Sequence, residues 1–170
     1  MILKLIGAAL VVIGCGSVGF RIAANQRQEE RDLRQLIGAL DYMECELQYR
    51  LTPLPALCKQ VATQWPGRVG DVFSDFLSEM ETQIAVDTES CMRAVLVRND
   101  KLSPDLLQIF THLGGSVGRF DIEGQLKELE YIRQECRRKL TVLENNRDVR
   151  LRGYQTLGLC AGAALAILFV

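Results

Sequence analysis

Apolar side chains recur at intervals of three or four residues through most of the chain. Because an α-helix turns once in 3.6 residues, this spacing places them on one face of a helix. The first such run ends at Leu51, where Thr52 is interpreted as a helix cap and Pro53 as a first-turn proline. The positions that define this first run are Leu33, Leu36, Ile37, Leu40, Met43, Leu47 and Leu51.

Turn and cap residues divide the rest of the chain into five more predicted helices. Pro66-Gly67 and Gly114-Gly115 are expected to end two of them. The last helix repeats apolar residues at heptad spacing, with one polar interruption at Arg133, and it is expected to continue into the C-terminal end. No segment alternates as a strand does, so the predicted fold class is all-α. The predicted starts are Leu54, a point near Asp71, a point after Asp87 and Thr88, Ser103-Pro104, and Ile122 after the N-cap Asp121.

Two uncharged segments, Leu5 to Phe20 and Gly153 to Val170, flank the polar middle of the chain. The second would form a helix of about 27 Å, close to the thickness of a bilayer core. We therefore predict an N-terminal transmembrane helix at 1–24, a helical bundle at 25–152 and a C-terminal transmembrane helix at 153–170. A cleaved signal peptide is the alternative for the N-terminus, although Arg21 lies where a cleavage region should be neutral.

Charge gives the expected orientation of these segments. The chain has 20 basic and 21 acidic residues, which excludes a strongly basic nucleic-acid-binding protein. Basic residues gather on the middle side of both predicted spans, and only Lys4 lies outside. The positive-inside rule therefore predicts a cytoplasmic bundle with both termini across the membrane. The six cysteines lack C-x-x-C spacing, as expected of reduced, mostly buried thiols.

The sequence contains no recognisable catalytic or cofactor-binding motif. His112 is the only histidine, so no local metal cluster is predicted, and a surface or capping position is favoured. Gly114, Gly115 and Gly118 suggest a phosphate loop, but no strand precedes them, which favours a turn between helices. The basic run at residues 137–139 could be a lipid-binding patch or a solvated helix face, and we favour the solvated face. We predict no enzyme activity, no cofactor and no metal.

A stripe of small residues follows one face of the predicted C-terminal span: Gly158, Gly162 and Ala166. Such stripes allow helices to pack closely in a membrane, either within one chain or between copies in a homo-oligomer. The alternative is the general enrichment of small residues in membrane helices.

Glu44 and Glu46 suggest a partner interface at the end of the first helix. Two residues apart, they point about 200° apart and cannot form one acid–base pair. Glu44 has no cation three or four residues away, so we hypothesise that both carboxylates meet a basic patch on a partner. For Glu46, an ordinary surface pair with Arg50 is the alternative. The predicted interface consists of Glu44, Glu46, Tyr49, Thr52 and Pro53.

Two segments of the chain carry distinctive patterns. The first is Gln35-Leu36, Ala39-Leu40, Glu44-x-Glu46-Leu47, Tyr49 and Thr52-Pro53-Leu54, and the second is Leu113-Gly114, Gly118, Asp121 and Gln125. Both segments resemble the stage III sporulation protein AB family. The resemblance also includes one apolar anchor at each end, and so covers essentially the whole chain. Val117 departs from the family pattern, which has Leu at this position.

The resemblance implies both a fold and a function. The family is similar in its soluble part to the helical cytoplasmic domains of the type II secretion F-type platform protein. It implies a non-catalytic component of the channel between mother cell and forespore, in the mother-cell side of the forespore membrane. The implied partners are the cytoplasmic ATPase stage III sporulation protein AA, other membrane proteins of the channel, and lipid, with no nucleic acid. The alternative is a membrane-bound helical sensor or signalling adaptor.

Overall fold

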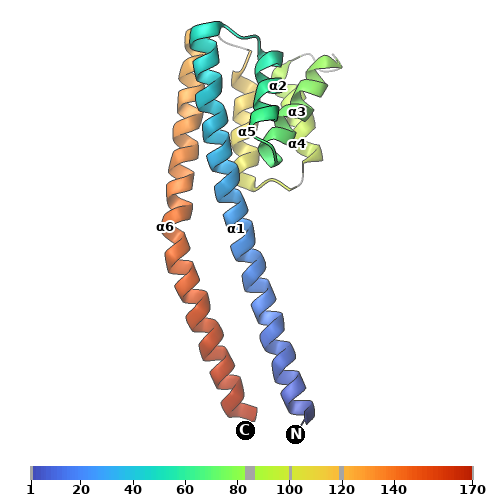
Figure 1. Ribbon diagram of the computed structural model, residues 1–170, viewed down its shortest axis with the longest axis vertical. Helices are drawn as coiled ribbons and strands as arrows, with labels where there is room; N and C mark the ends of the chain where they lie inside the picture. Colours follow the sequence, from blue (N-terminus) through green and yellow to red (C-terminus); the bar gives the residue numbers. More distant parts are fainter. Residues whose placement is uncertain (1, 83–86, 100, 119–120, 170) are drawn as a thin grey trace. The chain divides into compact units, whose positions relative to one another are not determined.

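The computed structural model describes the backbone of residues 2–82, 87–99, 101–118 and 121–169, and the side chains of 24–82, 87–99, 101–118 and 121–145. Within these ranges it contains α-helices and no strand, which confirms the all-α fold class (Figure 1). The helices are α1 (Ile2–Arg50), α2 (Leu54–Gln64), α3 (Arg68–Glu81), α4 (Thr88–Arg98), α5 (Pro104–Ser116) and α6 (Ile122–Phe169).

The chain divides into two compact units, which share α1 and α6. One unit contains residues 1–30 and 141–170, where the described backbone is helical. The other contains residues 31–140 and is called the bundle below. In the bundle, α2 packs on α3, α3 on α4, and α4 on α5 (Figure 1). Ion pairs join α1 to α6.

The core of the bundle consists mainly of aliphatic side chains, as the low aromatic content of the sequence leads one to expect. Phe73 and Phe110 add an edge-to-face ring contact with centroids 5.9 Å apart. The largest side chains that are almost fully buried are Phe73, Phe76, Phe110, Leu33, Leu36, Leu40, Met43, Leu57, Met92, Leu106, Ile109 and Leu113.

Side-chain caps confirm three of the predicted helix starts. Asp87 accepts a hydrogen bond from the Ser90 amide at 2.7 Å. Ser103 Oγ accepts one from the Leu106 amide at 3.3 Å, and Asp121 Oδ1 accepts one from the Gly124 amide at 3.0 Å. These bonds satisfy amides that have no partner within the first turn of a helix.

The predicted cap at Thr52 is wrong. Pro53 occupies the N-cap position of α2 and makes no side-chain capping bond. Thr52 Oγ1 instead donates to Glu46 Oε2 at 2.8 Å, because the buried carboxylate of Glu46 needs a donor. The first helix also ends one residue early, at Arg50, since Leu51 adopts a left-handed backbone with φ 54°.

Two other predicted boundaries shift. The third helix begins at Arg68, directly after the Pro66-Gly67 turn, and the prediction placed its start near Asp71. The predicted stop at Gly114-Gly115 is wrong, because α5 continues to Ser116. A Cβ added to Gly114 would lie 2.4 Å from the Cβ of Met92. This glycine therefore lets α4 and α5 approach closely and does not end the helix.

The predicted membrane spans are not confirmed. Among the described residues, no helix offers a run that is long and apolar enough to cross a bilayer. Apart from residue 24, however, the segments 1–24 and 153–170 lie outside the residues whose side chains are described. The same holds for Gly158, Gly162 and Ala166, so their packing remains a prediction. The backbone of α6 is helical throughout Ile122–Phe169, as expected.

Candidate functional site

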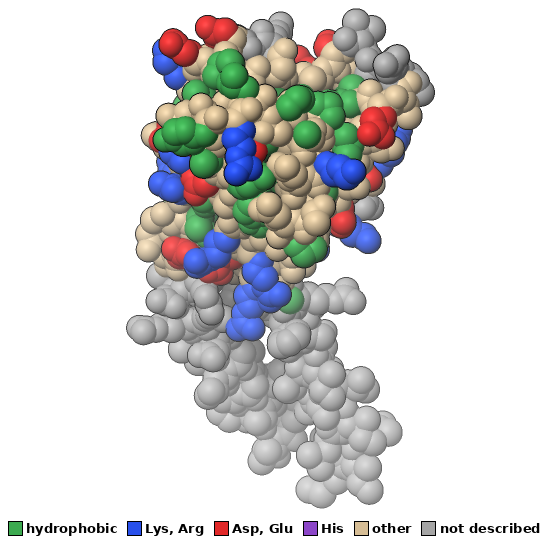
Figure 2. Space-filling view, turned by 45° about the horizontal axis from the view of Figure 1, so that its top comes forward, with side chains coloured by type: hydrophobic (Ala, Val, Ile, Leu, Met, Phe, Trp, Pro, Cys, Tyr) green, Lys and Arg blue, Asp and Glu red, His purple; other side chains and the backbone are tan. Residues whose placement is uncertain are grey.

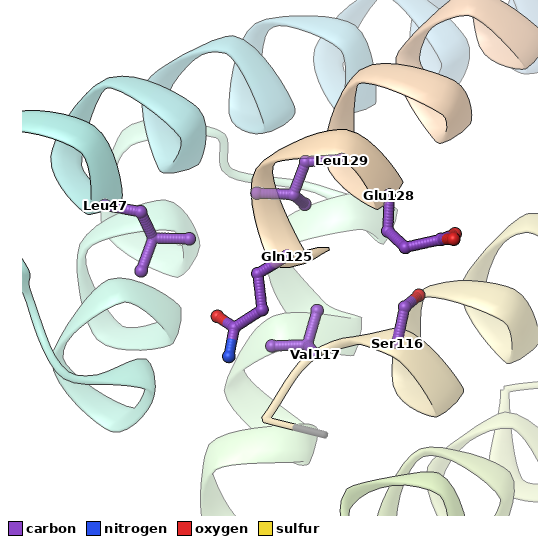
Figure 3. A pocket seen from close by; sticks show the side chains of 6 residues that line it. All are labelled: Leu47, Ser116, Val117, Gln125, Glu128 and Leu129. Atoms are coloured by element: carbon purple, nitrogen blue, oxygen red, sulfur yellow. The ribbon is translucent and has the colours of Figure 1, made fainter. Parts of the chain in front are cut away.

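The two segments that carry the family resemblance meet at one end of the bundle. A crevice there is lined by side chains from the last turn of α1, the end of α5 and the first turns of α6 (Figure 3). It has no enclosed room for a water molecule, so it is a packing seam and not a ligand pocket. The lining residues are Leu47, Ser116, Val117, Gln125, Glu128 and Leu129.

The connection between α5 and α6 also contacts the start of α2 and α4. Thr88 Oγ1 donates to the carbonyl oxygen of Val117 at 2.7 Å. Gly118 has φ 82°, and a Cβ added to it would lie 3.3 Å from Thr88 Cγ2 and 3.9 Å from Leu54 Cδ2. We call residues 46–54, 116–118 and 121–125 together the turn end of the bundle.

Glu46 is the buried polar centre of the α1–α2 turn. The residue is only 7% exposed, and its carboxylate accepts hydrogen bonds from Thr52 Oγ1 at 2.8 Å and Arg50 Nη1 at 3.1 Å. A buried carboxylate is costly unless donors surround it. These contacts tie the last turn of α1 to the turn that follows, so Glu46 and Thr52 fix the shape of this end.

Beside this buried centre, large apolar side chains are exposed. Tyr49 is 75% exposed, Leu51 is 62% exposed, and Ile122 at the start of α6 is 46% exposed. In Figure 2, which brings this end of the bundle forward, hydrophobic side chains lie at the surface between charged ones. A left-handed backbone costs a residue such as Leu51 about 1–2 kcal/mol. The turn end therefore presents apolar side chains on a firmly held but strained turn.

Glu44 belongs to a different set of contacts, between α1 and α6. Arg133 Nη1 lies 2.5 Å from Asp41 Oδ1 and 2.7 Å from Glu44 Oε2, and Nη2 pairs with Glu130. Arg137 Nη2 lies 3.8 Å from Asp41 Oδ2. We call these five residues the Arg133 cluster. The arginine is partly buried, with 18% of its side chain exposed.

The predicted interface residues thus divide into two groups. Glu44 and Glu46 have different surroundings, as their 200° separation indicated, but both have a cation within the bundle. The inference that Glu44 has no cation of its own is wrong, because Arg133 comes from a distant helix. For Glu46 the alternative is found, a pair with Arg50. Tyr49 and Pro53 are exposed, as an interface requires. Sequence reasoning missed Leu51, which it assigned to the apolar face of the helix.

His112 lies at the surface of the bundle, as predicted. Its Nε2 is 3.2 Å from Glu128 Oε2, and its ring packs edge-on against Tyr131 with centroids 5.5 Å apart. No set of His, Cys, Asp and Glu among the described side chains is arranged to hold a metal. In the basic run at 137–139, Arg137 and Arg138 are exposed, as predicted. Lys139 differs, because its side chain is 16% exposed and pairs with Asp105 at 2.6 Å.

The thiols within the bundle are mostly buried, as expected. Burial raises the pKa of Cys58 and of Cys136 to about 12, and burial followed by the negative charges of Glu79 and Asp87 raises that of Cys91. Because the thiolate is the reactive form, these three groups are inert at neutral pH. Cys45 is exposed on α1.

Three comparisons with known proteins agree with this arrangement. The family model described as Stage III sporulation protein AB matches residues 4–170. Stage III sporulation protein AB of Bacillus subtilis (strain 168) is 35% identical over 79 residues, which are 46% of this chain and 46% of that relative. The matched region thus spans about half the length of the relative.

A solved structure of a stage III sporulation protein AB gives the third comparison. It superimposes with a TM-score of 0.64 at 23% identity, covering 72% of this chain and 98% of the other, which shows a shared fold. The family match extends over nearly the whole sequence. The chain therefore belongs to the stage III sporulation protein AB family.

Proposed function

We propose that this chain is a membrane-anchored assembly component of the channel that links mother cell and forespore during endospore formation. Family membership supports the sporulation role, and the uncharged ends of the sequence support the anchoring. In this proposal, residues 1–24 and 153–170 cross the membrane on the mother-cell side. The bundle faces the cytoplasm, and both termini lie across the membrane.

The proposed partner of the turn end is a cytoplasmic secretion-type ATPase, stage III sporulation protein AA. The observation that carries this proposal is the exposed pair Tyr49 and Leu51, with Leu51 in a backbone conformation that glycine or asparagine adopts at lower cost. An exposed leucine adds nothing to the core, so recognition by a partner gives a reason for an apolar side chain there. Glu46 and Thr52 hold this surface in shape from beneath.

This assignment replaces an electrostatic interface with an apolar one. From residue 48 to residue 56 the only charged residue is Arg50, which pairs with the buried Glu46. The turn between α1 and α2 therefore offers the partner little net charge, and apolar contact provides the affinity there. Both α1 and α6 are continuous helices that run from this end to the proposed anchors. In the proposal, a displacement of the turn end by the ATPase is therefore passed along these two helices.

Binding of the ATPase to the full-length chain in membranes tests this proposal. We expect the double variant Tyr49→Ser and Leu51→Asn to weaken co-purification at least about tenfold, because it removes the apolar contacts. The matched control is Val97→Ser, which changes an 81% exposed side chain on α4. Equal binding by the double variant, with thermal stability unchanged, would place the ATPase contact elsewhere.

A separate experiment tests the anchoring. A reporter that is active only in the cytoplasm should work when inserted at the Pro66-Gly67 turn. A reporter fused after Val170 should be active only on the other side of the membrane. The opposite pattern would contradict the proposed topology, and it would also place the bundle out of reach of a cytoplasmic ATPase.

A further inference from the structure

We propose that the Arg133 cluster sets the register of α1 against α6 in the bundle. It is a conformational determinant built into the helix pair, and it does not depend on the proposed function. The polar interruption of the heptad pattern at Arg133 is its signature in the sequence. A single buried polar residue in a helical seam specifies register in the same way in coiled coils.

The buried side chains of α1 and α6 near the cluster are apolar, and apolar burial does not fix a register strongly. Leu36, Leu40, Met43 and Leu47 on α1 and Leu129, Ile132 and Cys136 on α6 are all buried. Apolar burial is non-directional, and cores tolerate exchanges among aliphatic side chains of similar volume. A slip of one helical turn, about 5.4 Å, would place other aliphatic side chains opposite one another at a modest loss of packing.

The cluster, in contrast, is directional. Arg133 Nη1 lies between Asp41 Oδ1 at 2.5 Å and Glu44 Oε2 at 2.7 Å, two carboxylates on neighbouring turns of α1. The guanidinium is planar and rigid, so its donors match acceptors in one geometry only. A slip of one turn breaks both contacts of Nη1 and leaves partly buried charges without their partners.

The cluster is also poorly built for stability alone. The cluster contains three carboxylates, from Asp41, Glu44 and Glu130, but only two cations. Of these, Arg137 is the more distant one. Arg133 Nε and Glu44 Oε2 are buried atoms without a hydrogen bond, although the latter lies 2.7 Å from Nη1. Partly satisfied polar groups contribute little net stability, whereas they still penalise wrong arrangements.

Arg137 makes the direction of a slip specific. It lies four residues, or about one turn, after Arg133 on α6, and it already approaches Asp41 at 3.8 Å. When Arg133 is removed, Arg137 is the cation that takes its place between Asp41 and Glu44. The expected second register is therefore displaced by one turn along α6.

Spin-label distance measurements on the full-length chain in liposomes test the proposal. One label occupies the exposed native Cys45, and the other occupies Lys127→Cys on the exposed side of α6. Cys15 and Cys160 are replaced by Ala, and the buried thiols do not react at neutral pH. We expect one narrow distance distribution for this parent, and for Arg133→Met a second maximum that corresponds to a shift of about one turn, near 5.4 Å.

A second variant keeps the test decisive if Arg133→Met fails to fold. The triple variant Asp41→Leu, Glu44→Met and Arg133→Leu removes together the three charges that meet at Arg133 Nη1 and keeps Glu130 and Arg137. We expect it to fold with an unchanged or higher Tm but a broadened distribution. The control Arg93→Met removes an exposed pair with Glu89 on α4 and should leave the distribution narrow. A narrow, unshifted distribution in the triple variant overturns the proposal. Unfolding of the triple variant also overturns it, because the cluster would then be holding the bundle together.

Discussion

Glu44 and Glu46 stand two residues apart on α1, yet they belong to different regions of the bundle. Glu46 lies in the turn end, where its carboxylate accepts from Thr52 and Arg50, both within six residues along the chain. Glu44 lies in the Arg133 cluster, where its cation comes from α6. The first carboxylate is fully provided with donors, and an oxygen of the second is buried without a hydrogen bond.

The difference shows that sequence distance between partners determines what an ion pair does. Local partners fix the shape of a single turn, and at the turn end they hold exposed apolar side chains in place. Distant partners fix how two helices lie against each other. The hydrogen bonding of the two carboxylates follows the same division. A turn can adjust its shape around one carboxylate, whereas two packed helices must keep their apolar contacts as well.

The largest expected effect follows from reversing the charge of Glu46. In Glu46→Lys, an ammonium group is buried beside Arg50 and Thr52 loses its acceptor, so we expect a loss of about 3 kcal/mol or more in the free energy of unfolding. Urea unfolding followed by circular dichroism measures it. The control Glu123→Lys, at an exposed position of α6, should change stability by less than about 0.5 kcal/mol. A similar small change in Glu46→Lys would mean that this turn is not held by its carboxylate.

The next effect isolates the bond between Thr52 and Glu46. Thr52→Val keeps the shape of the side chain but removes the donor, and we expect a loss of about 1.5 kcal/mol because the acceptor is charged. A double-mutant cycle with Glu46→Gln should show a coupling of about 1 kcal/mol between the two sites. Additive losses would instead support the sequence-based reading of Thr52 as a helix cap.

Local signals predicted the parts of this fold that local contacts determine. Asp121 caps its helix as expected, and Asp87 and Ser103 cap helices that begin close to the predicted points. In each case the capping side chain and its amide lie within three residues of each other. Thr52 and Gly114 were misread because each responds to something outside its own helix end. Thr52 turns back to Glu46, and Gly114 accommodates Met92 of a neighbouring helix.

The candidate site was predicted only in part for the same reason. Tyr49 and Pro53 are exposed next to a predicted helix end, which the pattern of the sequence could indicate. The cation of Glu44 comes from α6, which four other helices separate from α1 along the chain, and no periodicity reveals it. The exposure of Leu51 depends on its left-handed backbone, which a run of regularly spaced leucines conceals.

A smaller effect should follow from neutralising Glu44. In Glu44→Gln, Arg133 keeps Asp41 and Glu130, and the excess of negative charge falls, so we expect a change within about 1 kcal/mol. The informative quantity is the difference between the losses in the free energy of unfolding of Glu44→Gln and Glu46→Lys. The same urea titration measures both. A loss for Glu44→Gln as large as that for Glu46→Lys would show that both carboxylates are equally structural and would remove the distinction between the two regions.

The smallest expected effect has the opposite sign. Leu51→Asn places at φ 54° a residue that tolerates the left-handed region, and it removes an exposed side chain with few contacts. We expect the free energy of unfolding to stay the same or rise by up to about 1 kcal/mol. The matched control is Tyr49→Asn, which lies in a helical backbone and gains nothing from relieved strain. If Leu51→Asn lowers stability by more than its control does, the leucine contributes to folding and the turn end loses its distinction as a surface held for a partner. A stable Leu51→Asn variant that also binds the ATPase less tightly would separate folding from partner contact. Glu46 and Thr52 would then hold the fold of the turn, and Leu51 would provide the contact.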